Sequence, residues 1–239
     1  MNPAEEKTKE HFDAIAAHYK EEIPGPIRDH LNKKWWGRVS SYFSGRPRVI
    51  DIGCGDGTNA VFLKSKGISV VGVDLSTRLI QRGKERYPEL SGLIFEGSAL
   101  NLQFPEGAFD IAIMTGVLHH LYSRSEQKKA IEEALRVVRK NGVLIIRESN
   151  LINPLFRLFW NYVFPLTSKI DRFGGENWIS ARYLSDLFGD GVEKTFFFTF
   201  IPNFTPRRLI PLAGRVEKVL ESGPLKKLSA HYIVILKKR

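Results

Sequence analysis

The chain has 239 residues, of which 43% are hydrophobic and 26% charged, so it is long enough to bury a substantial core as a single domain. Its one cysteine, Cys54, excludes an internal disulfide and a cysteine-based zinc cluster, and we expect no metal site. The net charge is +10, and residues 151–239 hold 14 basic against 7 acidic side chains, which indicates either a solvated basic surface or attraction to an anionic partner.

The N-terminal sequence MNPAEEKTKE is polar and lacks the apolar stretch of a secretory signal. No run of about 18 apolar residues follows anywhere in the chain, so we predict a cytoplasmic protein without a transmembrane helix. Residues 1–45 contain two amphipathic segments, FDAIAAHYK and HLNKKWWGRVSSYF, and are predicted to form a helical N-terminal lid.

Residues 46–150 alternate short apolar runs with amphipathic ones. Such alternation is typical of a parallel sheet that is covered by helices on both faces. The runs predict strands at 48–52, 69–74, 92–95, 109–114 and 142–146, and helices at 58–66, 77–87 and 123–139. Residues 151–190 are predicted to form a helical cap, and residues 191–239 to return to strands at 195–201 and 230–236.

A glycine-rich loop, IDIGCGDG, follows the first predicted strand, where a parallel sheet binds its ligands. A dinucleotide fingerprint would be G-x-G-x-x-G, but here the third glycine, Gly57, comes one residue early. Asp51 and Asp56 would also repel a pyrophosphate and suit a cationic ligand better. Asp74, 21 residues after Gly53, ends the second strand and can accept hydrogen bonds from ribose hydroxyls.

Four motifs, IDIGCGDG, VVGVDLS, EGSALNLQFPEGAFDIAIMTGVLHHL and LRVVRKNGVLIIRE, follow one another at family-like spacing. With them, residues 12–148 resemble the class I S-adenosylmethionine-dependent methyltransferases, including the ubiquinone- and menaquinone-type enzymes. The resemblance implies S-adenosylmethionine as cofactor and S-adenosylhomocysteine as product. It also implies an α/β, Rossmann-like, doubly wound fold with a mostly parallel seven-stranded sheet.

The resemblance also assigns binding residues. The loop would contact the methionine part of the cofactor, Asp74 would bind the ribose, Leu75, Ser98 and Ala99 would surround the adenine, and Thr115 would lie under the cofactor. The N-terminal segment would close over the site through His18 and Tyr19. The implied loop residues are Asp51, Gly53, Cys54, Gly55 and Gly57.

Two positions depart from the family pattern. Ser98 stands where the family usually has Asp, although its hydroxyl can still form a hydrogen bond with adenine. Lys140-Asn141-Gly142 replaces the usual Pro-Gly-Gly turn, and Asn and Gly are themselves good turn residues, so no loss of function is expected.

Methyl transfer to oxygen or carbon needs a proton removed from the acceptor. His119 and His120, after the fourth strand, and Glu148, at the end of the fifth, are the candidate general bases. A structural role for the histidine pair stays open.

The acceptor is less determined. The Asn/Asp-Pro-Pro-aromatic loop of base-amine methyltransferases is absent, and Cys54 is placed in the cofactor loop rather than as a nucleophile, which argues against nucleic acid. The apolar segment LINPLFRLFWNYVFPL indicates either a buried cap helix or a lid over a lipid-like substrate. Arg207 and Arg208 fit an anionic or polar head group.

We therefore predict methylation at O or C of a small, apolar or lipid-like acceptor, with peripheral membrane contact through residues 151–239. The alternatives are an RNA methyltransferase and a non-catalytic protein that binds S-adenosylmethionine. The sequence does not indicate an oligomeric state.

Overall fold

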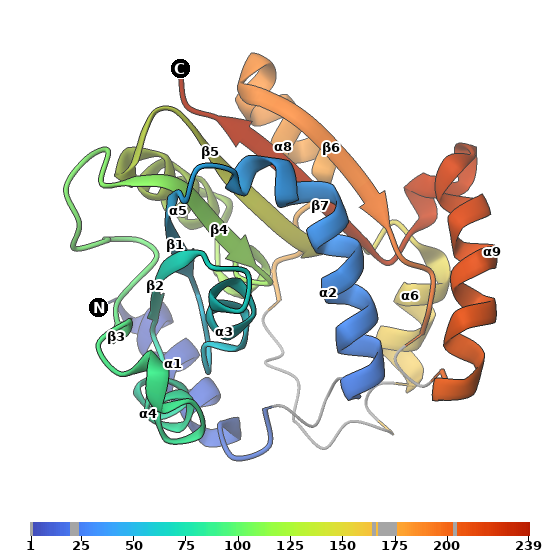
Figure 1. Cartoon of the computed structure of the whole chain (residues 1–239), viewed down its shortest axis with the longest axis horizontal. Coiled ribbons are helices and arrows are strands. Elements are labelled where there is room, and N and C mark those ends of the chain that lie inside the picture. Colours follow the sequence, from blue (N-terminus) through green and yellow to red (C-terminus); the bar gives the residue numbers. More distant parts are fainter. Residues whose placement is uncertain (1, 20–23, 164–165, 167–175, 203–204) are drawn as a thin grey trace.

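The computed structural model describes residues 2–19, 24–163, 166, 176–202 and 205–239. Its centre is a seven-stranded sheet in the order β3-β2-β1-β4-β5-β7-β6, with β7 antiparallel to both β5 and β6 and the other pairs parallel (Figure 1). The strands are β1 (Arg48–Ile52), β2 (Ser69–Asp74), β3 (Ile94–Glu96), β4 (Phe109–Thr115), β5 (Val138–Ser149), β6 (Val192–Phe198) and β7 (His231–Lys237). The predicted fold class is confirmed.

Helices cover both faces of the sheet (Figure 1). They are α1 (Pro3–Ile15), α2 (Gly25–Val39), α3 (Thr58–Lys64), α4 (Thr77–Arg86), α5 (Arg124–Val137), α6 (Pro154–Leu158), α8 (Ala181–Phe188) and α9 (Ile210–Ser222). Side chains alternate between two buried clusters along each strand: Val49 joins the cluster with Trp35 of α2, and Ile50 joins the one with Ala130 of α5. Because both faces of the strands are buried, residues that point to either face are apolar, and the strand sequences are continuous apolar runs.

The sheet order reverses direction between β1 and β4, because the chain leaves β1 toward β2 and returns past it to β4. Ligands of open α/β sheets bind beside this switch point, at the carboxyl ends of the strands. The glycine loop leaves β1 at that point.

Three parts of the C-terminal half differ from the prediction. Strand β5 is longer than expected, because it starts directly where α5 ends and pairs with β7 from Val143 to Ser149. Helix α8, expected in the cap, packs on the sheet with Ala181 and Leu184 buried. Helix α9 stands where only strands were expected; its outward side chains contribute little to the core, so its apolar residues do not mark a buried face. Residues 164–165 and 167–175 of the predicted cap lie outside the described residues.

Gly83, inside α4, marks the contact between that helix and the glycine loop. A Cβ added there would lie 2.5 Å from the carbonyl oxygen of Asp56. We predict that Gly83→Ala lowers the free energy of unfolding by about 1–3 kcal/mol, although alanine is normally the better helix former. Denaturant unfolding measures it.

Gly37 is the matched control, because it lies in α2 and an added Cβ meets nothing within 4 Å. Gly37→Ala should raise the free energy of unfolding by about 0.5–1 kcal/mol. A Gly83→Ala variant that is stabilised to the same extent would contradict the close packing of α4 on the loop.

Candidate functional site

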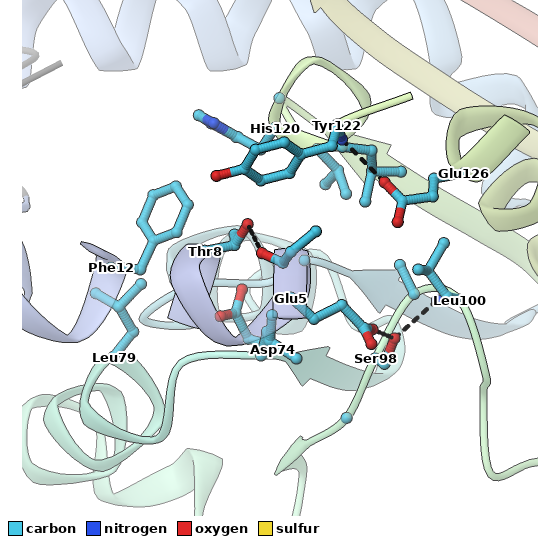
Figure 2. Close-up of a pocket in the computed structure, with 18 of the residues that line it drawn as sticks. Glu5, Thr8, Phe12, Asp74, Leu79, Ser98, Leu100, His120, Tyr122 and Glu126 are labelled. Carbon is cyan, nitrogen blue, oxygen red and sulfur yellow. Dashed lines mark hydrogen bonds between the residues drawn. The ribbon is translucent and has the colours of Figure 1, made fainter. Parts of the chain in front are cut away.

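A pocket opens at the carboxyl ends of β1, β2 and β4, under helix α1 (Figure 2). It encloses about 770 Å³ of empty space, its open mouth included. Eight of the residues nominated from the sequence line it: Tyr19, Gly53, Asp74, Leu75, Ser98, Ala99, Thr115 and His120.

The glycine loop forms one wall of the pocket. Gly53 has φ +71°, and a Cβ there would lie 2.4 Å from a methyl group of Val117, so only glycine fits. The backbone N–H groups of Gly53 and Cys54 donate to the carbonyl of Val73. The loop therefore folds back onto the end of β2 and leaves space above it for a ligand.

Asp74 connects the loop to the next helix. Its Oδ2 accepts a hydrogen bond from the Gly55 N–H at 2.7 Å, and its Oδ1 accepts one from the Ser76 N–H at 2.9 Å. Burial raises the pKa of Asp74, while these two backbone donors oppose the rise. The carboxylate is thus fixed in direction and lines the pocket.

Asp51 lies behind the loop and is fully buried. Within the described part of the chain, neither oxygen of its carboxylate has a hydrogen-bond partner. Burial, and then the nearby charge of Asp74, raise the pKa of Asp51 to about 7. A buried carboxyl group without a donor is costly, and a cationic ligand in the adjoining pocket would offset that cost.

We predict that Asp51→Asn stabilises the ligand-free protein at pH 8. The folded-state pKa of about 7 exceeds the ordinary 3.8, so the group's stabilising contribution is present below about pH 4 and lost as the pH rises through 7. Asparagine does not ionise, so the variant keeps this part of the free energy of unfolding, which is on the order of 2–4 kcal/mol.

Denaturant unfolding at pH 8 and near pH 4 measures this difference. The variant should exceed the wild type at pH 8 and match it near pH 4. Equal stability of the two proteins at pH 8 would show that Asp51 carries no electrostatic strain.

Helix α1 covers the pocket through one polar face. Residues at intervals of four along it bind the core: Glu5 accepts from the Ser98 hydroxyl, Lys9 pairs with Glu96, and Asp13 accepts from the Ser76 hydroxyl at 2.6 Å. Figure 2 shows Glu5 and Ser98 side by side at the floor of the pocket. Since α1 buries no residue completely, these polar contacts contribute much of its attachment to the core.

Aromatic rings close the end of the pocket beyond α1. Phe12 packs edge-on against His120, with ring centroids 4.9 Å apart, and also contacts Tyr19. A Cβ on Gly55 would lie 3.4 Å from the Tyr19 ring, so this tyrosine lies directly over the glycine loop. His18 is not among the lining residues.

The two histidines of the turn Leu118–His120 have different environments. His119 Nδ1 is 2.6 Å from Glu148 Oε2, and its ring stacks on Trp178 with centroids 4.5 Å apart. Burial lowers the pKa of His120 well below its usual range, so His120 is neutral. Glu148 does not line the pocket; its Oε1 accepts the backbone N–H groups of Val117 and Leu118. It therefore orients the turn and the His119 ring together.

Cys54 and Gly57, two loop residues nominated from the sequence, face the core and not the pocket. The Cys54 sulfur packs toward Gly72, and burial raises the pKa of its thiol well above the usual range, so it is no nucleophile. Gly57 precedes α3 with φ +75°, and a Cβ there would lie 2.4 Å from Leu90. Neither residue lines the pocket.

Several lining residues were not nominated from the sequence. They include Glu5, Thr8 and Phe12 of α1 and Tyr122 and Glu126 at the start of α5. The sequence NPAE carries the signature of a capping box, which the structure forms between Asn2 and Glu5. That signal marks where α1 starts, but nothing in it indicates the contact with Ser98.

Comparison with known proteins gives three findings. Residues 50–146 match the family model described as a methyltransferase domain. A demethylmenaquinone methyltransferase of Beutenbergia cavernae is 31% identical over 140 residues, which are 57% of this chain and 55% of the relative. A tRNA (carboxymethyluridine(34)-5-O)-methyltransferase of Arabidopsis thaliana is 31% identical over 142 residues, 56% of this chain and 30% of the relative.

Among solved structures, a SAM-dependent methyltransferase from Archaeoglobus fulgidus superimposes with a TM-score of 0.62 over 87% of this chain and 94% of that one. Its sequence identity of 18% supports a shared fold. The chain spans about half the length of the demethylmenaquinone methyltransferase that it matches.

Proposed function

We propose that this chain, which carries a class I S-adenosylmethionine-dependent methyltransferase domain, methylates oxygen or carbon of a small, apolar or lipid-like acceptor. The observation that carries the proposal is the pocket at the switch point. Asp74, a carboxylate of fixed direction, lines this pocket, Asp51, a buried carboxylate without a donor, lies behind the loop that walls it, and α1 covers it.

The residues present fit the cofactor. Asp74 would accept from the ribose hydroxyls, while Leu75 and Ala99 would contact the adenine and Ser98 would bind its polar edge. Asp51 would balance the positive charge of the cofactor from behind the loop. When bound, S-adenosylmethionine supplies an activated methyl group on a sulfonium. The protein's part is to align the acceptor with it and to exclude water.

His119 is the proposed general base; it adjoins the pocket through its neighbour His120, which lines the pocket, and is not itself a lining residue. Its Nδ1 hydrogen-bonds Glu148, which leaves Nε2 as the basic atom, and Nε2 has no partner in the described part of the chain. Glu148 would hold this tautomer and stabilise the imidazolium that forms. Glu148 thus acts through His119, as a positioning residue.

Aromatic side chains extend from His119 toward the cap and support an apolar acceptor. Trp178 stacks on His119, Trp160 of the π-helix η5 (Phe159–Val163) meets Trp178 edge-on at 5.2 Å, and Phe156 of α6 stacks with Trp160. Such rings bury ring-shaped or prenyl groups well. The similarity to a demethylmenaquinone methyltransferase makes a quinone-like acceptor the leading choice.

Arg147 is a cation paired with Thr115 in the register of β4 and β5, at the end of the sheet where the pocket opens. Its guanidinium forms no hydrogen bond or ion pair within the described residues and lies over the Phe198 ring, 5.9 Å from the ring centroid. Burial lowers its pKa to about 10, so it stays charged at neutral pH. We propose that it recognises a polar or anionic head group on the acceptor.

An RNA acceptor is the second candidate, because a tRNA methyltransferase is as similar to this chain as the quinone enzyme is. The net charge of +10 would also favour RNA. Against it stands the aromatic cluster beside His119, which suits an apolar acceptor.

Peripheral contact with a membrane is part of the proposal, since an apolar acceptor would be dissolved there. No helix among the described residues is long and apolar enough to span a bilayer. Contact would therefore be at the surface, through residues 151–239.

Production of S-adenosylhomocysteine from defined acceptors tests the proposal. Turnover with a prenylated hydroquinone, and none with tRNA carrying carboxymethyluridine, is the expected result. Turnover with the tRNA alone would favour the second candidate. Cofactor binding without turnover on any acceptor, including cell lipid extracts, would favour a non-catalytic binding protein.

A further inference from the structure

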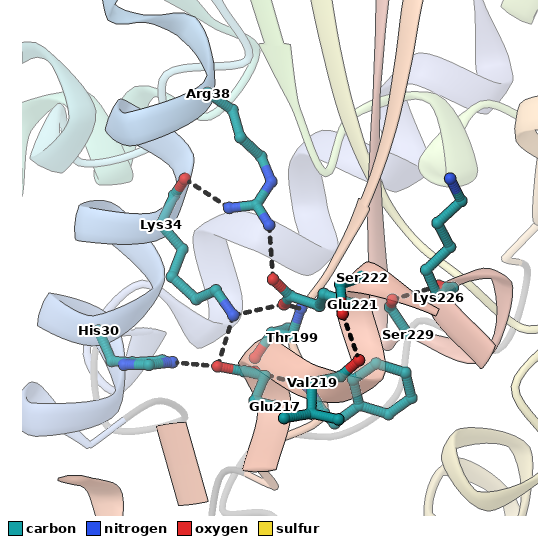
Figure 3. A network of polar contacts seen from close by, with 11 residues as sticks. His30, Lys34, Arg38, Thr199, Glu217, Val219, Glu221, Ser222, Lys226 and Ser229 are labelled. Atoms are coloured by element: carbon teal, nitrogen blue, oxygen red, sulfur yellow. Dashed lines mark hydrogen bonds and ion pairs between the residues drawn. The ribbon is translucent and has the colours of Figure 1, made fainter. Parts of the chain in front are cut away.

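Helix α9 is oriented with its two acidic residues, Glu217 and Glu221, toward the protein. Glu217 is 1% exposed and accepts from His30 at 2.8 Å and from the Phe200 N–H at 2.6 Å. Glu221 accepts from Arg38 at 2.6 Å and from the Thr199 N–H. Lys34 of α2 lies between the two carboxylates and pairs with both (Figure 3).

This network fixes α9 against α2 by hydrogen bonds and ion pairs. Ile210 and Ala213, which are partly buried, add apolar packing against the core. A surface helix normally does the reverse, with its apolar face inward and its charges in water. The apolar residues of α9 must therefore point elsewhere.

Leu209, directly before the helix, together with Leu212, Val216 and Val219 of the helix, forms a stripe that faces solvent, which we call the α9 stripe. Their side chains are 51%, 60%, 54% and 70% exposed. The spacing of three, four and three residues places them on one side of the helix. Four large apolar side chains in a row, each more than half exposed, indicate a surface that binds another apolar phase.

Cations accompany the stripe. Arg208, Arg215 and Lys218 lie along one edge of it, and Arg207, Lys226 and Lys227 lie at its two ends; all six are exposed. None of them forms an ion pair within the described residues. The two acidic residues of this segment, Glu217 and Glu221, both point toward the protein. The charged side chains on the outward face are therefore all positive.

We propose that the α9 stripe and its six cations dock onto an anionic lipid bilayer, with α9 lying flat at the headgroup level. Apolar side chains enter the acyl boundary and lysine and arginine pair with lipid phosphates, as in interfacial amphipathic helices. A second copy of the chain fits worse, because a two-fold contact through this face would set cations against cations.

The position of α9 relative to the cap supports this occupant. Asn150, just before the cap, donates to the carbonyl oxygens of Lys227 and Ser229, beyond the end of α9. Ile152, Leu158 and Tyr162 of the cap segment are 57%, 54% and 69% exposed. The inference rests on the proposed lipid-like acceptor, which would enter from the bilayer that α9 touches.

Cosedimentation of the full chain with vesicles tests the proposal. Vesicles of phosphatidylcholine containing phosphatidylglycerol should bind the protein, and phosphatidylcholine alone should bind it at least tenfold less. Leu212→Ser/Val219→Ser should weaken binding to the anionic vesicles about tenfold or more. Arg215→Gln/Lys218→Gln should weaken it about tenfold and reduce its salt dependence.

Lys128→Gln/Lys129→Gln, on the exposed face of α5, removes the same charge elsewhere and should bind vesicles nearly as the wild type does. Wild-type protein that stays in solution with anionic vesicles, or stripe variants that bind like the wild type, would overturn the proposal. So would a wild-type dimer that the stripe variant converts to a monomer.

Calorimetry with S-adenosylmethionine separates this proposal from the proposed function. The stripe variants should bind the cofactor as the wild type does, because α9 does not line the pocket. Wild-type protein that binds the cofactor but does not bind vesicles would count against the α9 proposal alone. Intact vesicle binding without cofactor binding counts against the proposed function alone.

Discussion

Asp74→Ala is expected to weaken S-adenosylmethionine binding by about 10- to 100-fold, as hydrogen bonds to a charged group are lost. The side chain does two things at once. It accepts from the Gly55 N–H at 2.7 Å and from the Ser76 N–H at 2.9 Å, and it faces the pocket where the ribose would lie. Its removal therefore takes away a ligand contact and loosens the loop. Isothermal calorimetry gives the change in dissociation constant.

Asp110→Asn is the matched control for that measurement. Asp110 stands near the opposite, amino-terminal end of β4, where it pairs with Arg48 and Arg139 on the surface. The control should change cofactor affinity by less than about twofold, because surface ion pairs contribute little. If Asp74→Ala bound the cofactor as tightly as Asp110→Asn, the ribose assignment would be wrong.

His119→Ala is expected to lower kcat by about 10²- to 10⁴-fold while leaving cofactor affinity within about threefold of the wild type. The proposed role is proton removal from the acceptor, by a ring that Glu148 orients at 2.6 Å. Glu148→Gln keeps the shape of the side chain but loses its charge, so it should also lower kcat and shift the pH dependence of turnover. Steady-state kinetics across pH measures both variants.

His120→Ala distinguishes the two histidines. Burial keeps His120 neutral, and its ring packs on Phe12 at the closed end of the pocket. Its replacement should mainly weaken cofactor binding or closure by α1. A larger loss of kcat in His120→Ala than in His119→Ala would assign the base to His120 instead. Near-normal turnover in both would exclude either histidine as the base.

The parallel half of the fold could be predicted because its residues obey simple rules. Strands β1, β2 and β4 are buried on both faces, so their sequences are continuous apolar runs. The loop after β1 could be recognised from the spacing of its glycines. The antiparallel β7 and β6 were also readable as apolar runs. Helix α9 was not, because its apolar residues face solvent and its buried residues include Glu217.

The candidate site was predictable in part for a related reason. Asp74, Ser98 and Thr115 follow strand ends, and strand ends meet at one edge of a parallel sheet. The contribution of α1 depends on docking across the chain, as when Glu5 meets Ser98, and no local pattern encodes that. Likewise, only the packed structure separates His119, paired with Glu148, from its neighbour His120.

Methyl transfer from labelled S-adenosylmethionine to fractionated cell extract tests the central claim most directly. With the wild-type protein, label should enter the organic phase, and His119→Ala should transfer far less in the same time. Label that enters nucleic acid instead would contradict the lipid-like acceptor. Absence of label in every fraction, from protein that binds the cofactor, would contradict methyl transfer itself.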